Sequence, residues 1–285
     1  MAWNLNNSLI RVLSILISVC MLVCCAPFCC AEENRSTIQP ERLQELVDLY
    51  IQQNDLYGDI ISIGYAYPAT GETWYYHPDT WYYSASLYKV PLMMILAEKE
   101  FKGELTANSE INGMTLREIE KEVLTYSNNS VAYSTMLSIA EPSECRKMFL
   151  RFANQPEDYY TWDFYSGSSF TARFMTEVMM NLYQNSEHFP GIIEQMKNAQ
   201  PGHYFGLKIG EMVDIAQKYG SYHDENDNDW NHTAGIIFSP NPFVLTVLTR
   251  YGGISETIIG DFAALFYDYT MSLDSSALSV DGRVD

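Results

Sequence analysis

The stretch YSASLYKVPLMM, residues 83–94, decides how the rest of the chain is interpreted. Aromatic residues lead into it, and after Lys89 apolar residues follow one another as they do at the start of a buried helix. If Ser86 stands at the N-terminus of that helix, Lys89 lies one turn later on the same face, close enough to accept the hydroxyl proton. A single Ser-x-x-Lys arises by chance about once in a chain of this size, so its meaning depends on the motifs that accompany it.

A second polar motif, Tyr126-Ser127-Asn128-Asn129, lies between two expected helices. The hydroxyl of Ser127 could relay a proton to a leaving group, and the amide of Asn129 could hold an amide of the substrate. An alternative stays open here, because Ser and Asn before a helix are also preferred capping residues.

A third motif, Lys218-Tyr219-Gly220-Ser221, stands at the end of an expected strand. Lysine at this place adds positive potential to a pocket, and glycine lets a substrate backbone approach the strand edge. Lys208-Ile209-Gly210 competes for the same role, but no convincing edge strand runs into it. His232, near Gly235, is a further candidate for contact with a substrate.

The rest of the chain shows two kinds of hydrophobic pattern, one helical and one strand-like. Helical periodicity dominates the middle of the sequence, and strand-like runs rich in Ile, Val and aromatic residues lie on both sides of it. A helix is expected to open at Pro40, and the other expected helices are residues 90–102, 115–124, 130–139, 143–152, 171–183 and 255–269. The expected strands are residues 59–67, 72–76, 212–219, 233–238 and 243–251. The sheet is therefore assembled from both ends of the chain around a helical insertion.

Taken in order, the three motifs resemble those of the penicillin-interacting serine hydrolases, the superfamily of class A β-lactamases and low-molecular-weight penicillin-binding peptidases. The resemblance covers about residues 40–270, including the hairpin after the Lys motif. It implies an α/β (α+β) fold of the β-lactamase/transpeptidase-like type, with an antiparallel sheet flanked by helices and an inserted all-helical subdomain. The expected catalytic domain is 32–271, with its α/β part at about 40–88 and 203–271, its helical part at about 89–202, and a flexible tail at 272–285.

The resemblance also implies roles for the motif residues. Ser86 is the acylated nucleophile, Lys89 its general base and Ser127 the proton shuttle, while Lys218 gives electrostatic and structural support. The backbone N–H groups of Ser86 and Ser221 form the oxyanion hole. Such chemistry passes through an acyl-Ser86 ester, and it needs no metal and no cofactor.

The implied substrate-binding residues are Asn129, which positions the substrate, and Tyr219, Gly220 and Ser221. At Tyr219 the chain departs from the family, which commonly has Thr or Ser there with a hydroxyl that helps to bind the substrate carboxylate. Tyr219 is bulky and carries its hydroxyl far from the backbone, so it does not supply the hydroxyl that the family uses to bind the carboxylate, and Ser221 is a partial substitute. Asn128 stands where class A lactamases usually have Asp.

Class A lactamases also use a loop glutamate to activate the water that clears the acyl-enzyme. Residues 154–163 offer Glu157 as the candidate deacylation base, without the usual Arg-x-x-Glu context. A solvated loop carboxylate is the alternative interpretation of Glu157. Without a base the ester turns over slowly, which favours a peptidase-like or penicillin-trapping protein over an efficient lactamase.

Composition and the N-terminal segment bear on the expected partners and cellular location of the protein. The 36 acidic and 17 basic residues give a formal charge of -19, which repels polyphosphate, so we expect no nucleic-acid partner. Residues 12–30 are almost wholly apolar, so residues 1–31 read as a signal peptide or N-terminal anchor, with acylation of a cysteine as a further alternative. Five of the six cysteines lie in this segment, which leaves only Cys145 in the exported part and no internal disulfide.

These inferences predict an exported serine hydrolase that acts on β-lactam or peptide amide bonds through acyl-Ser86. Its expected partner is a β-lactam or a small substrate that resembles a peptidoglycan stem peptide. We expect a monomer that is secreted or extracytoplasmic and membrane-associated, attached to a membrane only through its N-terminus. The alternative is a catalytically impaired lactamase-like domain that serves as a cell-wall or peptide-binding module.

Overall fold

The computed structural model describes residues 37–225, 229–250 and 256–278. The expected N-terminal leader, residues 1–31, lies outside these ranges, as do the residues after 278. In the part of the chain that is described, no helix is both long and apolar enough to cross a membrane.

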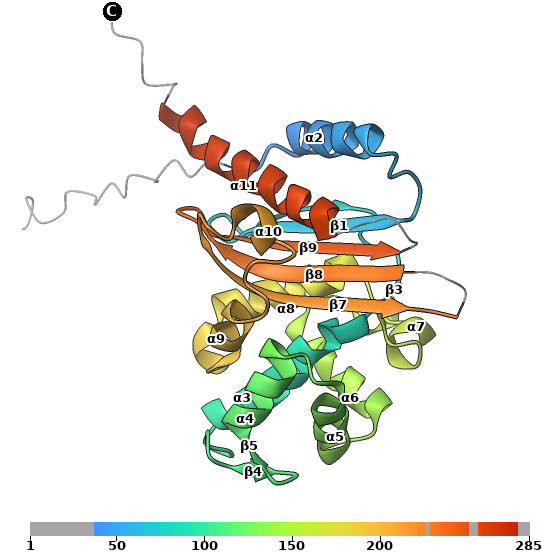
Figure 1. Ribbon diagram of the computed structural model, residues 1–285, viewed down its shortest axis with the longest axis vertical. Coiled ribbons are helices and arrows are strands. Elements are labelled where there is room, and N and C mark those ends of the chain that lie inside the picture. The colour runs from blue at the N-terminus through green and yellow to red at the C-terminus, as the bar shows by residue number, and fades with distance from the viewer. Residues whose placement is uncertain (1–36, 226–228, 251–255, 279–285) are drawn as a thin grey trace, which may run out of the picture. The chain divides into compact units, whose positions relative to one another are not determined.

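A five-stranded antiparallel sheet with the strand order β2-β1-β9-β8-β7 lies between two layers of helices (Figure 1). Strand β1, from the N-terminal part, pairs with β9, from the C-terminal part, so the sheet is complete only when both ends of the chain meet. The prediction of an antiparallel sheet built from both chain ends and flanked by helices is therefore confirmed. The strands are β1 (Ile61–Tyr67), β2 (Glu72–Tyr76), β7 (Asp214–His223), β8 (Asp229–Phe238) and β9 (Phe243–Arg250).

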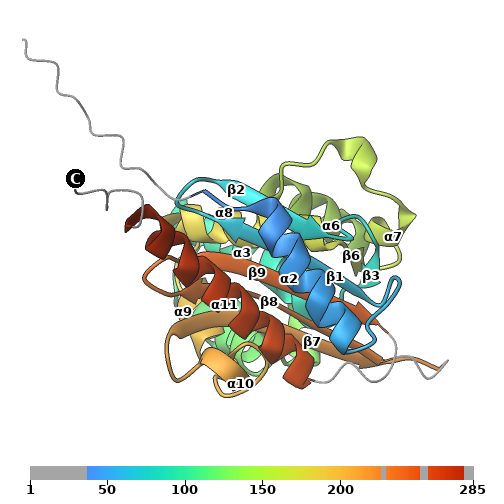
Figure 2. The same cartoon turned by 90° about the horizontal axis from the view of Figure 1, so that it is seen from above.

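Two long helices, α2 (Pro40–Gln53) and α11 (Glu256–Leu278), cover one face of the sheet, with the short α10 (Gly206–Ile209) beside them (Figures 1 and 2). In α2 the buried residues Leu43, Val47 and Ile51 recur every four positions, which places them on one side of the helix. Tyr65 of β1 stacks on Phe266 of α11, with ring centroids 5.2 Å apart. This layer anchors both chain ends to the sheet.

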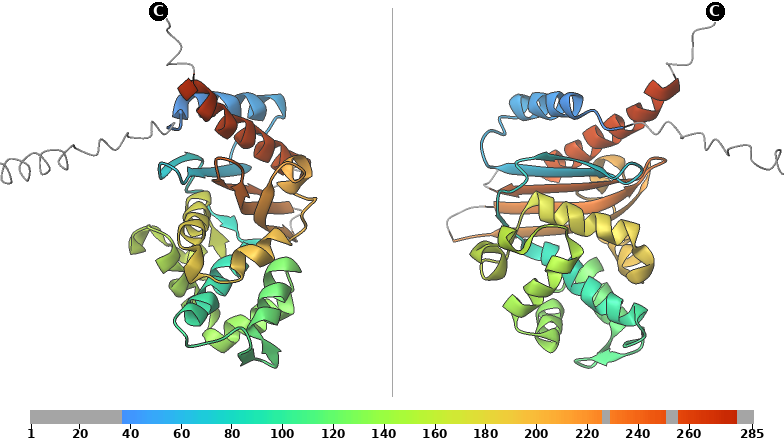
Figure 3. Two further views of the ribbon diagram at one scale, coloured as in Figure 1. Left: turned by 90° about the vertical axis from the view of Figure 1, so that its left-hand side faces the viewer. Right: turned by 180° about the vertical axis from the view of Figure 1, so that it is seen from behind.

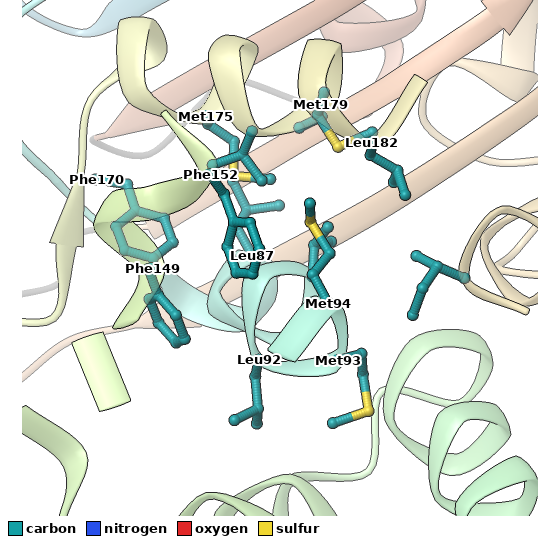
Figure 4. Close-up of a cluster of buried hydrophobic side chains, with 14 of the residues drawn as sticks. Leu87, Leu92, Met93, Met94, Phe149, Phe152, Phe170, Met175, Met179 and Leu182 are labelled. Atoms are coloured by element: carbon teal, nitrogen blue, oxygen red, sulfur yellow. The ribbon is translucent and has the colours of Figure 1, made fainter. Parts of the chain in front are cut away.

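The opposite face carries the helical part of the chain (Figure 3). Helix α8 (Ala172–Gln184) lies against the sheet, and α3 (Lys89–Phe101) runs through the middle of this part, where Lys89 to Ala97 are all buried. Figure 4 shows Leu87 and Met94 below Met175 and Met179 of α8 in this core. Around them lie α4 (Leu116–Glu120), α5 (Asn129–Ile139), α6 (Pro142–Phe149), α7 (Trp162–Tyr165) and α9 (Ile192–Lys197).

Helix α11 is longer than its sequence suggests. The helix continues to Leu278, so the prediction that a loose tail begins at residue 272 is wrong. Leu273 is fully buried, and the hydroxyls of Thr270 and Ser272 donate hydrogen bonds to helix carbonyls, which lets polar residues continue the helix.

Two short antiparallel pairs have no counterpart in the sequence prediction. They join β3 (Tyr82–Tyr83) to β6 (Ser169–Phe170) and β4 (Glu110–Ile111) to β5 (Met114–Thr115). Two residues are too few to show an alternating pattern, so sequence periodicity cannot reveal them. The first pair, extended by a hydrogen bond from Ser84 N to Ser168 O of 2.8 Å, holds the segment that leads into Ser86.

Candidate active site

Ser86 lies in a 3-10 turn, Ala85–Tyr88, that runs directly into α3. The buried Ala85 has a φ of +45°, in the left-handed region that residues with a side chain seldom adopt. Lys89 is the first residue of α3, and its Nζ lies 3.0 Å from Oγ of Ser86. The strained turn thus places the hydroxyl of Ser86 next to the amine of Lys89, at the spacing that one helical turn provides.

The second motif combines the two roles that its sequence left open. Asn128 is the cap, because its Oδ1 accepts hydrogen bonds from the backbone N–H groups of Ser130 and Val131 at the start of α5. Ser127, with a φ of +56°, and Asn129 instead turn their polar atoms to Lys89. The structure therefore brings Ser127 and Asn129 into the site and leaves Asn128 to support the helix.

Four oxygen atoms surround Nζ of Lys89. The backbone oxygen of Ser127 and Oδ1 of Asn129 each lie 2.6 Å away, and both atoms only accept hydrogen bonds. A neutral amine can donate its two hydrogens to these acceptors. Its lone pair would then face the hydroxyls of Ser86 and Ser127, whose oxygens are each 3.0 Å from Nζ. In that state Lys89 can take the proton of Ser86.

Lys218 approaches the same hydroxyls from the sheet. It lies on β7, the edge strand that faces the start of α3 (Figure 1). Its side chain is fully buried, and Nζ donates hydrogen bonds of 2.9 Å to Oγ of Ser127 and to the backbone oxygen of Tyr219. Ser127 Oγ therefore bridges the two lysines.

Gly220 permits this close contact between β7 and the Ser86 turn. A Cβ atom at Gly220 would lie 2.8 Å from the backbone nitrogen of Ser86 and 3.0 Å from Cβ of Ala85, closer than side-chain carbons come to backbone atoms. The next residue, Ser221, is exposed beside this contact. Strand β7 thus presents its free edge to Ser86.

Burial sets the protonation of both lysines. Burial lowers the pKa of Lys89 to about 8. Burial, and then the charge of Lys89, lower the pKa of Lys218 well below its usual range. Both nitrogens contact the hydroxyl of Ser127, and the lowered pKa values make the neutral amine easier to form here than at an exposed lysine.

The family comparison agrees with this arrangement. The model of the beta-lactamase enzyme family matches residues 41–141 and 113–270, which together span most of the chain. The chain belongs to the beta-lactamase enzyme family. The resemblance drawn from three ordered motifs is therefore confirmed, and the protein is a β-lactamase-like hydrolase by family and fold.

Solved β-lactamase structures share the fold at low sequence identity. A β-lactamase from Chitinophaga pinensis DSM 2588 is 14% identical with a TM-score of 0.68, over 80% of this chain and 98% of its own. The TLA-3 extended-spectrum β-lactamase is 15% identical with a TM-score of 0.67, over 81% and 99%. An ancestral (GNCA) class A β-lactamase is 14% identical with a TM-score of 0.63, over 79% and 99%. No curated protein is similar enough in sequence to count as a relative.

Glu157 lies outside the cluster of this β-lactamase-like site. It begins an exposed 3-10 turn, and among the described residues its carboxylate accepts no hydrogen bond. In the same part of the chain, no carboxylate is hydrogen-bonded to the two lysines or the two serines of the site. The geometry therefore matches the solvated carboxylate more closely than the deacylation base.

The two competing sequence candidates have structural roles. Lys208 lies on α10, half-exposed, and its Nζ pairs with Asp261 at 2.9 Å, away from any strand. His232 is fully buried, which favours a structural role over contact with a substrate. Its Nδ1 accepts a hydrogen bond from Thr249 N, so its Nε2 carries the hydrogen and donates it to the backbone oxygen of Tyr83, just before the Ser86 turn.

Sequence reasoning missed Tyr204, which lies beside Tyr219. The two rings stack at 5.1 Å with planes 13° apart. Tyr204 belongs to a loop whose only signal in the sequence is the break at Pro201-Gly202, and such a break does not indicate which side chains the loop brings to the site.

Proposed function

We propose that this β-lactamase-like protein cleaves β-lactam or peptide amide bonds through an ester on Ser86. The observation that carries the proposal is the surroundings of Lys89. Two acceptors lie 2.6 Å from its Nζ and can take both hydrogens of the neutral amine, which would direct the lone pair toward Oγ of Ser86 at 3.0 Å. A burial-lowered pKa of about 8 makes the neutral amine available at ordinary pH.

In the proposed acylation, Oγ of Ser86 bonds to the substrate carbonyl carbon while Lys89 takes the hydroxyl proton. The negative charge on the carbonyl oxygen would be met by the backbone N–H groups of Ser86 and Ser221. Ser127 lies between Lys89 and Lys218, so it is placed to pass a proton to the leaving nitrogen as the carbon–nitrogen bond breaks. The product is an acyl ester on Ser86.

Removal of that ester requires an activated water. Among the described residues, no carboxylate contacts the cluster, and Glu157 lies on an exposed turn. We therefore expect a long-lived ester, as in a peptidase-like or penicillin-trapping protein. A binding module without turnover has no need for an amine whose lone pair faces a serine hydroxyl, so the geometry supports the enzyme more than that alternative.

Intact-protein mass spectrometry after incubation with a penicillin and with its methyl ester tests the proposal. We expect wild-type protein to gain the mass of the whole lactam and Ser86→Ala to gain none. Ser130→Ala is the matched control, because Ser130 is exposed on α5 outside the cluster. An adduct that lasts for hours would indicate a trapping protein, and one that lasts for seconds an efficient lactamase. Folded wild-type protein that gains no adduct from either compound would refute acylation and leave the binding module.

We also propose that the protein is exported, as its apolar N-terminal segment suggests. The remaining cysteine, Cys145, is buried and unpaired, so the folded part does not depend on a disulfide. Fractionation of cells that express the full chain, with the mass of the mature N-terminus, tests this. Recovery of the uncut chain in the cytoplasm would contradict it.

A further inference from the structure

Lys218 has no hydrogen-bond donor left for a substrate. Its side chain is fully buried, and Nζ donates to Oγ of Ser127 and to the backbone oxygen of Tyr219. The ring of Tyr219 covers the same nitrogen, with the ring centroid 3.9 Å from Nζ. A neutral amine has two N–H bonds, and the two oxygens take both; in the ammonium form the third N–H bond lies beside the aromatic ring and is screened from a substrate.

The ring of Tyr219 is held in this place by its neighbours. It stacks on Tyr204, with centroids 5.1 Å apart. Burial raises the pKa of the Tyr219 phenol, so the phenol is neutral beside Lys218. The face of the Tyr219 ring is therefore held by Tyr204.

The loop that supplies these partners is itself fastened to the sheet and to α11. The buried amide of Gln217, the residue before Lys218, donates to the backbone oxygens of residues 199, 200 and 203. Glu256, at the start of α11, accepts a hydrogen bond of 2.8 Å from Tyr204 N. Gln200 and Tyr204 have φ values of +47° and +52°, a strained backbone that persists only where the surroundings hold it.

We infer that Tyr219 makes this site select substrates that carry no carboxylate beside the scissile amide, such as neutral amides or esters. A carboxylate loses its hydration on entering the site, and it needs charged donors to offset that loss. Of the described residues hydrogen-bonded to Ser86, Ser127 or Lys218, only the two buried lysines have basic side chains, and their N–H groups are directed at oxygens within the site. The formal charge of -19 adds repulsion. This inference rests on the proposed function.

A penicillin and its methyl ester form a matched pair for the test, since they differ in this one carboxylate. The second-order rate of acylation is measured with both compounds for wild-type protein and for Tyr219→Thr, which would uncover Lys218. Tyr219→Phe keeps the ring, and Tyr133→Thr makes the same kind of change at an exposed tyrosine of α5. Circular dichroism verifies the fold of each variant.

We expect wild-type protein to react at least about tenfold faster with the ester, and Tyr219→Thr to lower this ratio by about tenfold, as gain of a charged hydrogen bond implies. Tyr219→Phe and Tyr133→Thr should keep the wild-type ratio. Equal wild-type rates for acid and ester would overturn the inference, even if Tyr219→Thr does not fold. So would a ratio that Tyr219→Thr leaves unchanged. Absence of acylation by both compounds would overturn the proposed function itself.

Discussion

Oγ of Ser127 and Nζ of Lys218 lie 2.9 Å apart, although 91 residues separate them in the chain. One belongs to the helical part and the other to the edge strand of the sheet. The same hydroxyl is 3.0 Å from Nζ of Lys89, so it joins two amines that the sequence places on different elements. The site is complete only when the helical part and the sheet are docked together.

Ser127→Ala should slow acylation by roughly 100-fold or more, because it removes the group placed to move a proton to the leaving nitrogen. The measurement is the rate of adduct formation at Ser86, with Ser130→Ala as the control. If Ser127→Ala reacted as fast as wild-type protein, Ser127 would have no part in proton transfer.

The rate of acylation should depend on the protonation of Lys89. The neutral amine is the active form, and its pKa is lowered to about 8, so the rate should rise about tenfold per pH unit below that value and level off above it. A pH profile of the acylation rate shows this directly. A rate that is constant between pH 6 and 9 would argue against Lys89 as the base.

Gly220→Ala should impair both folding and acylation. The new Cβ would meet the backbone nitrogen of Ser86 at 2.8 Å, and backbone cannot move aside cheaply, so we expect a loss of about 1–3 kcal/mol in the free energy of unfolding. Gly202→Ala is the matched control, because a Cβ there meets no atom within 4 Å. Denaturant unfolding measures the free energy of unfolding of the two variants. Equal values would contradict the close packing of β7 on the Ser86 turn.

His232 should make the protein less stable in acid. Burial lowers its pKa to about 4 from an ordinary value of 6.5, so below pH 6.5 the unfolded chain binds a proton that the folded chain binds only near pH 4. This contribution to stability is complete above pH 6.5 and falls as the pH drops through that window, by up to about 3 kcal/mol. Unfolding of wild-type protein and of His232→Gln at pH 7 and 4.5 tests this, since the variant should lose less stability. An equal loss in both proteins would assign the acid sensitivity to other groups.

Asn128 explains one departure from the family pattern. Its Nδ2 donates a hydrogen bond of 2.9 Å to Oε2 of Glu122 while its Oδ1 caps α5. Asn128→Asp would keep the cap but set two carboxylates against each other, so we expect it to cost about 1 kcal/mol of stability at pH 7. Adding Glu122→Gln to the Asn128→Asp variant should restore the stability that Asn128→Asp alone loses. Thermal unfolding of the single and double variants measures this, and an Asn128→Asp protein as stable as wild type would mean that the repulsion is absent.

Much of the fold could be predicted because its signals are local. The strand at 72–76 has the bounds that the sequence predicts, and the expected helix at 130–139 differs from α5 by one residue. Errors arose where context outweighs pattern. Helix α11 continues through a polar segment because Leu273 is buried, and the two-residue strands depend on partners distant in the chain.

The order and spacing of three motifs were enough to indicate the family, and the resemblance made Ser86 and Lys89 the candidate nucleophile and base. Ser86 and Lys89 could be paired from the sequence because three residues make one helical turn, a relation that needs no other part of the chain. The burial of His232, the exposure of Glu157 and the covering of Lys218 by Tyr219 could not be read this way. Each depends on how the sheet and the helical part pack, since packing between distant segments determines which side chains lose contact with water and which donors remain free for a substrate.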